Sequence, residues 1–373
     1  MRVVHISKVT GVAGSEGHLL RLLPGLAQEG VEVRMIVLED PCCPAASFCH
    51  ALEEHGVPVE TLPIHGHLDP LLLPQLVQKL RSLQPDVVHT HLIHADLYGL
   101  WSAARAGVPA AVSSRHNDDA FRHNSMFKRV NRWAMRYADR VIAISQVLAR
   151  FVVEVEDIDP AKIITVHYGL EAPPLTPEAC ELARAALGYR SDVQLVGVFG
   201  RLVRQKGIDV LLEAFARVRA CCPMAQLLIV GDGPLRSRLE RQSQVLGLGG
   251  VAKFIGWVDQ ASRLMPACDV VVVPSRWEGF GLVTLEAMGW SKPLVASRVS
   301  ALPEIILDGE TGLLVPPEDA YALAEAIQFL LADSERAVAM GRAGRERLLK
   351  EFSVEKMVDA TLDVYIQTLR TAG

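Results

Sequence analysis

Hydrophobic and polar positions alternate between two patterns along the first half of the chain. Short apolar runs occupy residues 3–6, 33–38, 87–88, 110–112 and 141–144, and segments with apolar residues at helical spacing, such as residues 17–28, separate them. Buried strands that alternate with amphipathic helices predict βαβ units and a parallel sheet covered on both faces. The first half is therefore predicted to be one α/β domain.

The second half repeats this alternation after a break. The pattern lapses near residues 168–190 into the Pro-rich stretch 171–177, and apolar runs return at residues 194–199, 227–230 and 270–273. After Pro317 the chain is predicted to be almost wholly helical, with a helix start at Phe352 and Ser353. We predict an N-terminal domain at residues 1–168, a linker at 169–192 and a C-terminal domain at 193–352. Two doubly wound domains are expected to bind ligands at the carboxyl ends of their strands, in a cleft where they face each other.

Composition narrows the functional class. The 373 residues are 50% hydrophobic and 22% charged, with a net charge of −5, which suits a globular two-domain protein and disfavours nucleic acid as a partner. The seven cysteines form no CxxC pair, which favours a reduced, cytoplasmic compartment. We expect no signal peptide and no membrane-spanning helix, so any membrane contact is expected to be peripheral.

The most specific chemical signal follows the predicted strand 270–273. The loop contains Glu278-Gly279-Phe280-Gly281, and a helix is predicted from about Leu282 to Met288. Glycines allow close backbone approach, and N–H groups at a helix start favour a phosphate, so the loop suits a diphosphate. Glu278, before the helix, is placed to reach a sugar hydroxyl, and Glu286, one turn inside it, to accept bonds from two ribose hydroxyls. Taken alone, such glutamates would more often be solvated surface charges.

Two further glycine-containing loops follow the first strand of each domain. In the second domain, Arg201 and Lys206 lie where a guanidinium and an ammonium group can neutralise a pyrophosphate and its charge in the transition state. In the first domain, residues 9–18 contain GxxGxxG, which is not the dinucleotide fingerprint GxGxxG. Gly14 is the expected ligand contact in that loop, and a purely packing role stays open.

Together these segments resemble the retaining glycosyltransferases of family 4, which have the GT-B architecture of two Rossmann-like domains. The resemblance covers nearly the whole chain and includes residues 231–234, 254–258, 302–304 and 308–315. Its most specific motif is the E-x7-E element from Glu278 to Glu286. It implies that Arg201 and Lys206 hold the donor diphosphate, Glu278 the transferred sugar and Glu286 the ribose.

The same resemblance implies further site residues. It places His116, within Ser-Arg-His-Asn at 114–117, near the reacting sugar, and the backbone near Trp257 and Val258 beside the base. It also implies that the C-terminal helix, 353–373, packs back on the first domain. Tyr168 departs from the family pattern, in which many members carry Asn. The predicted catalytic residues are His116, Glu278, Arg201 and Lys206, and the predicted donor-binding residues are Gly14, Arg201, Lys206, Trp257, Val258, Glu278, Gly279, Phe280, Gly281, Leu282, Val283 and Glu286.

No metal or other cofactor is expected. The sequence DxD occurs at Asp157-Ile158-Asp159, but beside a proline in a predicted connection, which favours a solvated turn. If Arg201 and Lys206 carry the leaving-group charge, a divalent ion is unnecessary. The expected reaction is a retaining transfer in which the acceptor hydroxyl attacks from the face that the diphosphate leaves, with a departing phosphate oxygen as the base. UDP is the preferred donor nucleotide and GDP the next.

The acceptor is the least defined part of the prediction. Residues 125–141 are interpreted as one helix with Met126, Val130, Trp133, Ala134, Tyr137 and Val141 on one side and basic residues on another. The apolar side is expected to cover the sheet, while peripheral contact of this basic helix with an anionic membrane is an alternative. A sugar, a lipid-linked molecule or another small molecule with a hydroxyl group are all candidate acceptors.

Three other functions fit parts of the pattern. A nucleotide-sugar epimerase on the same fold would use the donor site and add no acceptor. An NAD-dependent oxidoreductase is suggested only by the loop 9–18, and failure to bind NAD would exclude it. A non-catalytic nucleotide-sugar-binding protein is disfavoured by the presence of both glutamates and both cations.

Overall fold

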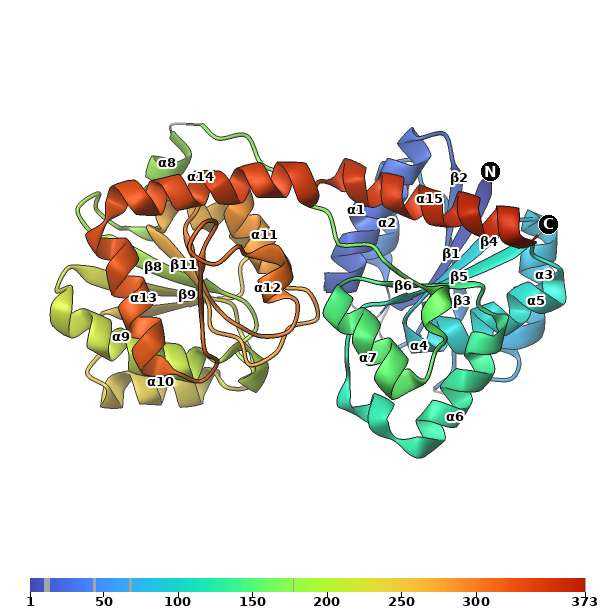
Figure 1. Ribbon diagram of the computed structural model, residues 1–373, viewed down its shortest axis with the longest axis horizontal. Coiled ribbons are helices and arrows are strands. Elements are labelled where there is room, and N and C mark those ends of the chain that lie inside the picture. Colours follow the sequence, from blue (N-terminus) through green and yellow to red (C-terminus); the bar gives the residue numbers. More distant parts are fainter. Residues whose placement is uncertain (10–13, 43–44, 67–68, 177, 373) are drawn as a thin grey trace. The chain divides into compact units, whose positions relative to one another are not determined.

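The computed structural model describes residues 1–9, 14–42, 45–66, 69–176 and 178–372. The chain divides into two compact units (Figure 1). Unit 1 contains Met1–Gly169 and Val354–Gly373, and unit 2 contains Leu170–Ser353. Each unit is an α/β domain, as the alternating pattern predicts.

Unit 1 is built on a seven-stranded parallel sheet with the order β3-β2-β1-β4-β5-β6-β7. Its strands are β1 (Arg2–Val9), β2 (Glu32–Glu39), β3 (Val59–Pro63), β4 (Val87–His91), β5 (Ala110–Arg115), β6 (Arg140–Ala143) and β7 (Ile163–Thr165). The order reverses direction between β1 and β4, which makes the sheet doubly wound.

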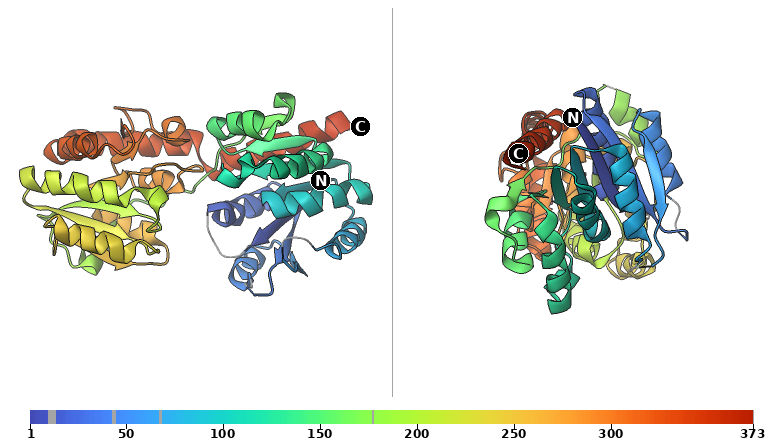
Figure 2. Two further views of the ribbon diagram at one scale, coloured as in Figure 1. Left: turned by 90° about the horizontal axis from the view of Figure 1, so that it is seen from below. Right: turned by 90° about the vertical axis from the view of Figure 1, so that its right-hand side faces the viewer.

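Helices cover both faces of this sheet (Figure 2). They are α1 (Gly14–Gln28), α2 (Ala46–Glu54), α3 (Leu72–Leu83), α4 (Leu92–Ala95) with a following π-helical turn (Asp96–Leu100), α5 (Trp101–Ala106), α6 (Ser125–Ala134), α7 (Gln146–Glu156) and α15 (Val354–Ala372). Alternate residues of β1 face opposite cores, because side chains in a strand point to opposite sides. Val3 packs with α1, α2 and α15, whereas Val4 packs with α3 and α5.

The helix α15 is part of the unit 1 core although it follows unit 2 in the chain. Its Val358 and Tyr365 are buried in the same cluster as Leu22 of α1. Gly25 makes this close packing of the two helices possible, because a Cβ atom there would lie 2.5 Å from Cγ2 of Val358. Any larger side chain at position 25 would push α1 and α15 apart.

Unit 2 has a six-stranded parallel sheet of the same winding, β10-β9-β8-β11-β12-β13. Its strands are β8 (Gln194–Phe199), β9 (Ala225–Val230), β10 (Ala252–Gly256), β11 (Val270–Val273), β12 (Leu294–Ser297) and β13 (Leu313–Val315). Its helices are α8 (Glu178–Leu187), α9 (Ile208–Cys221), α10 (Arg236–Val245), α11 (Leu282–Gly289), α12 (Leu302–Ile305), α13 (Ala320–Ala332) and α14 (Ser334–Glu351). The direction of the strand order reverses between β8 and β11, so the loops after these two strands are neighbours.

Two expectations change in the structure. The segment expected to be a linker belongs to unit 2 from Leu170 onward and contains α8, whose Arg184 donates to Asp269 at 2.8 Å. The single helix expected over residues 125–141 is wrong, because α6 ends at Ala134 and Val141 lies in β6. Residues 135–137 form a 3-10 turn between the helix and β6. Among the described residues, no helix is long and apolar enough to cross a membrane.

Candidate active site

The loops after β8 and β11 form one joined structure at the switch point of unit 2. Gly207 of the first loop lies so close to the second that a Cβ atom would approach the Pro274 carbonyl oxygen to 2.0 Å, and its φ of +60° also favours glycine. The backbone N–H of Arg276 donates to the Gln205 carbonyl at 2.7 Å, and the Gln205 side chain donates to the Trp277 carbonyl at 3.0 Å. The two predicted donor loops are therefore brought together at the position where ligands of doubly wound sheets bind.

Arg276 fixes the spacing of the two loops. Its two terminal guanidinium nitrogens donate to the two carboxylate oxygens of Asp209 at 2.9 and 3.0 Å, and Nε donates to Glu318 at 2.7 Å. One terminal nitrogen also donates to the Arg204 carbonyl at 2.8 Å. The hydrogen bonds to Asp209 and Glu318 raise the pKa of Arg276 above its usual value. A bidentate Arg–carboxylate pair holds its geometry well, so the loops are rigidly joined.

Lys206 of the loop after β8 and Glu278 of the loop after β11 form an ion pair. The Lys206 Nζ donates to Oε1 of Glu278 at 2.6 Å, and the Ser275 hydroxyl donates to the same oxygen at 2.6 Å. The backbone N–H of Glu278 donates to the Ser300 hydroxyl at 3.1 Å. Glu278 is only 6% exposed, and its carboxylate is held by a cation and a hydroxyl while its backbone is held by Ser300. The pair brings together one residue predicted for the sugar and one predicted for the diphosphate.

The helix α11 begins at Leu282, four residues after Glu278. Gly281 precedes its first residue with φ of +95°, which favours glycine, and a Cβ atom there would lie 2.6 Å from Cδ2 of Leu302. Leu282 and Val283 form the first turn and are partly exposed. Glu286 lies one turn farther on and is also partly exposed. The start of α11, where backbone N–H groups have no partner within the helix, thus follows Glu278 closely in the chain.

The remaining predicted donor residues of unit 2 differ in exposure. Phe280 is 3% exposed and its ring packs edge-on against Phe352, so the part that it offers a ligand is its backbone. Arg201 is exposed, and its side chain makes no hydrogen bond or ion pair with the described residues. Trp257 follows β10 and is 74% exposed, and Val258 is partly exposed. Arg201 is therefore a guanidinium that a bound anion can recruit without breaking an ion pair.

The two predicted residues of unit 1 lie at the carboxyl edge of its sheet. Gly14 is the exposed first residue of α1, and residues 10–13 of its loop are outside the described residues. His116 directly follows β5 and is 7% exposed. Its Nδ1 lies 2.6 Å from the Tyr168 hydroxyl and its Nε2 lies 3.1 Å from Nδ1 of His91. Burial, reinforced by the positive charge of Arg115, lowers the pKa of His116 to about 3. His116 is thus a neutral imidazole with both nitrogens engaged, and its role in the reaction stays a prediction.

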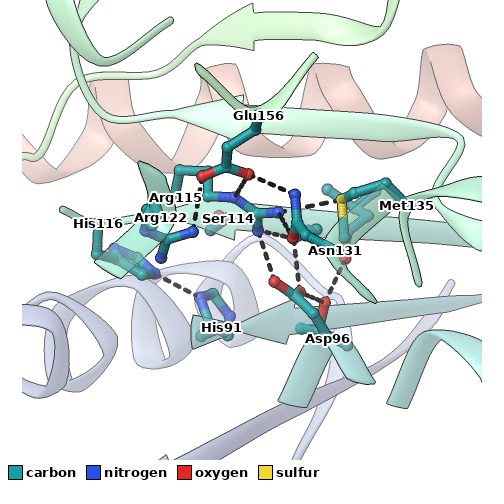
Figure 3. A network of polar contacts seen from close by, with 12 residues as sticks. His91, Asp96, Ser114, Arg115, His116, Arg122, Asn131, Met135 and Glu156 are labelled. Atoms are coloured by element: carbon teal, nitrogen blue, oxygen red, sulfur yellow. Dashed lines mark hydrogen bonds and ion pairs between the residues drawn. The ribbon is translucent and has the colours of Figure 1, made fainter. Parts of the chain in front are cut away.

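Buried charges support the backbone that carries His116 (Figure 3). Arg115 donates to Asp96 at 2.5 Å and to Glu156 at 2.9 Å, and Arg122 donates to the other Glu156 oxygen at 2.7 Å. Asn131 of α6 joins the network by donating to Glu156 at 2.8 Å. All these groups are buried, so the pairing compensates charges that would be costly if left alone. The network ties β5, α6 and α7 into a rigid base for the loop after Arg115.

The DxD sequence has structural roles. Asp157 ends α7 with φ of +58° and pairs with Arg132 at 2.6 Å, and both side chains are exposed. The Asp159 side chain accepts a hydrogen bond from the N–H of Ala161 and caps a 3-10 turn. These contacts are those of a solvated turn, in agreement with the interpretation from the sequence.

Sequence reasoning missed several residues that shape the site. Arg276 stands two residues before Glu278, and Asp209 stands three residues after Lys206, so each is adjacent to a predicted residue. Their pairing links loops 67 residues apart in the chain, which no local pattern discloses. His5 and His91 were also missed, although a charged or polar residue inside an apolar strand run is a signal in itself.

The fold and the joined loops define a doubly wound α/β protein with a candidate ligand site at the carboxyl ends of parallel strands. The family model "Glycosyl transferases group 1" matches residues 181–347, and "Glycosyltransferase Family 4" matches residues 12–172. The alpha-maltose-1-phosphate synthase of Mycolicibacterium smegmatis is 32% identical over 306 residues, which are 75% of this chain and 78% of that protein. The chain belongs to glycosyltransferase family 4 and is a glycosyltransferase.

Two further similarities extend over the whole chain. The lipopolysaccharide core biosynthesis glycosyltransferase LpsE of Rhizobium meliloti is 29% identical over 360 residues, covering 94% of this chain and 95% of that protein. The crystal structure of Anabaena Alr3699/HepE in complex with UDP matches with a TM-score of 0.86 at 24% identity, covering 98% of this chain and all of that one. The latter confirms the predicted GT-B fold of two parallel-sheet domains.

Proposed function

We propose that the protein transfers a sugar from a nucleotide-diphosphate sugar, with UDP as the preferred nucleotide and GDP next, to a hydroxyl acceptor with retention of anomeric configuration. The observation that carries the proposal is the Lys206–Glu278 pair, in which a cation suited to a diphosphate and a carboxylate suited to a sugar hydroxyl are 2.6 Å apart. The UDP bound by the Anabaena relative supports the choice of nucleotide.

Within the proposal, the two cations of unit 2 handle the leaving group. Lys206 is fixed beside Glu278, and the exposed Arg201 has no competing partner among the described residues. As the bond from the anomeric carbon to the phosphate oxygen breaks, negative charge accumulates on the diphosphate, and both cations stabilise it. Because two positive charges face this charge, the proposed reaction needs no metal ion.

The carboxylate and the departing phosphate complete the proposed step. Glu278 accepts a hydrogen bond from a hydroxyl of the donor sugar and holds the ring beside Lys206. The acceptor oxygen bonds to the anomeric carbon on the face that the diphosphate leaves, and its proton passes to the departing phosphate oxygen. Glu286 accepts hydrogen bonds from the ribose hydroxyls, and backbone N–H groups at the start of α11 contact the diphosphate.

The donor half of this proposal is tested by thermal shift of the full chain with UDP-, GDP- and ADP-glucose. A ligand that binds only the folded state raises the apparent melting temperature, and we expect the largest rise with UDP-glucose. Lys206→Ala is expected to abolish most of this rise. Absence of a rise with every nucleotide sugar contradicts the proposal.

Turnover separates the proposal from its alternatives. Incubation of UDP-glucose with candidate acceptors, followed by NMR of the product, is expected to show a new glycosidic bond with the anomeric configuration of the donor. An isomerised sugar nucleotide formed without acceptor would instead indicate an epimerase. Binding without any turnover would indicate a non-catalytic binding protein.

For the acceptor side we propose contact with an anionic membrane surface from the cytoplasmic side. Three of the apolar residues of α6 do not cover the sheet as expected: Met126 is 74% exposed, Val130 40% and Trp133 39%. Arg129 and Arg132, on the adjoining side of the helix, are exposed as well. An exposed helix with one apolar and one basic side suits the interface of an anionic bilayer, where a lipid-linked acceptor would be found. The lipopolysaccharide-related name of the Rhizobium relative agrees with such an acceptor.

Vesicle sedimentation tests this membrane contact. We expect the full chain to sediment with vesicles containing anionic lipid, less so at high salt, and the variant Met126→Ser with Trp133→Ser to stay in the supernatant. Equal sedimentation with neutral vesicles, or none with anionic ones, contradicts the proposal.

A further inference from the structure

Four buried histidines of unit 1 form a continuous hydrogen-bonded series. His91, which contacts His116, has its Nε2 2.9 Å from Nδ1 of His5. The Nε2 of His5 in turn lies 3.4 Å from the hydroxyl of Tyr365. The same hydroxyl lies 2.7 Å from Nδ1 of His89. The Nε2 of His89 ends the series 2.7 Å from the Ser114 hydroxyl. We call the groups from Tyr168 through His116, His91, His5, Tyr365 and His89 to Ser114 the histidine chain.

The strand register explains why these side chains meet. His5 of β1 is paired with His89 of β4, and His91 is two residues farther along β4 and therefore on the same face. That face is covered by α15, which supplies Tyr365. The histidines replace apolar residues in the middle of a parallel sheet, where a polar group is retained only if it is hydrogen-bonded.

All four imidazoles are neutral. Burial lowers the pKa of His5 to about 3 and lowers those of His89 and His91 well below the usual value. A neutral imidazole has one N–H donor and one acceptor nitrogen. Since each histidine in the chain uses both nitrogens, the tautomer of one determines the tautomer of the next. His116, His91 and His5 therefore have only two complete arrangements, with every proton on Nδ1 or every proton on Nε2. His89 is not bound by this rule, because the Tyr365 oxygen can accept from His5 and His89 at the same time.

These hydrogen bonds couple His116 to residues that it does not touch. His116 is linked to the Tyr365 hydroxyl of α15 through His91 and His5, by three successive hydrogen bonds. We infer that this series holds His116, His91 and His5 in one shared tautomer, so that His91, His5 and Tyr365 are positioning residues that fix which nitrogen of His116 carries the proton.

A metal ion is the competing occupant of this region. Nitrogens of His5, His89 and His91 lie within 4.8 Å of one another, which is close enough for three ligands. Each of their nitrogens already has a partner of complementary type within the chain, however, and all three side chains are at most 1% exposed. A bound ion would have to break the hydrogen bonds that satisfy these groups, so the histidine chain accounts for them better.

The role of the histidine chain in catalysis rests on the proposed function. Nε2 of His116 is bonded to His91, so Nδ1 is the nitrogen that can contact a sugar hydroxyl, in exchange for Tyr168. One shared tautomer makes this nitrogen a donor, and the other makes it an acceptor. The histidine chain thereby links Tyr365 of α15 to His116, the residue predicted to lie beside the sugar.

Histidine tautomers are read directly by two-bond ¹H–¹⁵N NMR of the full chain without ligand, at pH 7.5. We expect His5, His91 and His116 each to show a single form, with the proton on the same ring nitrogen in all three. Tyr365→Phe, three hydrogen bonds away from His116, is expected to give His116 a mixture of forms. Different forms among the three histidines of the wild type, or an unchanged His116 signal in Tyr365→Phe, overturn the inference, as does a protein that contains a stoichiometric metal ion.

A matched pair of variants at position 91 tests the catalytic role. Asn places an amide where His91 has Nδ1 and retains the bond to His116, whereas Leu has nearly the same shape and no polar atom. We expect kcat/KM to fall about fivefold in His91→Leu, the ratio that corresponds to one ordinary hydrogen bond, and to stay within about twofold of wild type in His91→Asn. Equal values in the two variants overturn the positioning role. If no transfer is found with any substrate, the proposed function fails. The NMR result still decides whether the histidine chain exists.

Discussion

Acid is expected to unfold unit 1 selectively. All twelve histidines of the chain lie between residues 5 and 167, and unit 2 contains none. Five of them, His5, His18, His89, His91 and His116, are buried and have lowered pKa values, with burial as the main cause. In the unfolded chain these imidazoles bind a proton near pH 6.5, whereas in the folded unit they stay neutral to a much lower pH.

The sign and the size of the effect follow from proton linkage. Between pH 6.5 and the folded pKa, the unfolded state binds more protons, so the stability of unit 1 is complete above pH 6.5 and is lost as the pH falls below it. For His5 and His116, with folded pKa values of about 3, each histidine removes about 2 kcal/mol between pH 8 and pH 5. Together the two remove about 4 kcal/mol, a large part of the 5–15 kcal/mol that stabilises an ordinary domain.

The assay must resolve the two units within the full chain. Guanidinium unfolding at pH 8, 7, 6 and 5, with pulse proteolysis and mass spectrometry of the fragments, gives a separate midpoint for peptides of each unit. We expect the midpoint of unit 1 to fall steeply below pH 6.5 and that of unit 2 to change much less. His5→Gln is expected to reduce the acid sensitivity of unit 1 by about 2 kcal/mol, and the exposed position in His50→Gln serves as the control. Equal stability of unit 1 at pH 8 and pH 5 refutes the reasoning.

Three further predictions concern single interactions. Glu278→Gln removes the partner that holds Lys206 at 2.6 Å, so we expect UDP to bind about fivefold more tightly by calorimetry while turnover falls at least a hundredfold; weaker UDP binding would contradict this. Arg276→Ala frees the two donor loops, and we expect the donor KM to rise about tenfold, whereas an unchanged KM would show that the loops are held otherwise. Arg115→Met leaves Asp96 and Glu156 without their shared cation, and denaturant unfolding is expected to show a loss of about 3–5 kcal/mol in unit 1, with a loss below about 1 kcal/mol as the contrary result.

The pattern along the chain was sufficient for the fold because the elements of parallel α/β sheets have local sequence patterns. Each buried strand is a short apolar run and each helix has its own period, so the alternation alone indicates two doubly wound domains. The helix expected over 125–141 shows where this reasoning fails. Polar Asn131 is buried because Glu156 pairs with it, and apolar Met126 is exposed, so the apolar residues did not mark the buried side.

The geometry of the candidate site was predictable to the extent that its residues are local to a motif. Glu278 and Lys206 each follow a strand in a glycine-containing loop, and the structure brings them within 2.6 Å. Partners that come from distant parts of the chain were not predictable, because their pairing depends on strand order. The bond of Arg276 to Asp209, and that of His89 to Tyr365 across 276 residues, are of this kind.

The place of α15 in the chain has a consequence for biosynthesis. Unit 1 needs Val358 and Tyr365 to close its core, yet these residues are translated only after the whole of unit 2. Domains generally fold in the order in which they leave the ribosome, but here the second unit is complete before the first. During that interval the face of the sheet that carries His5, and the side of α1 that carries Leu22, lack the cover of α15, so nascent unit 1 exposes apolar and histidine side chains to chaperones until α15 has emerged.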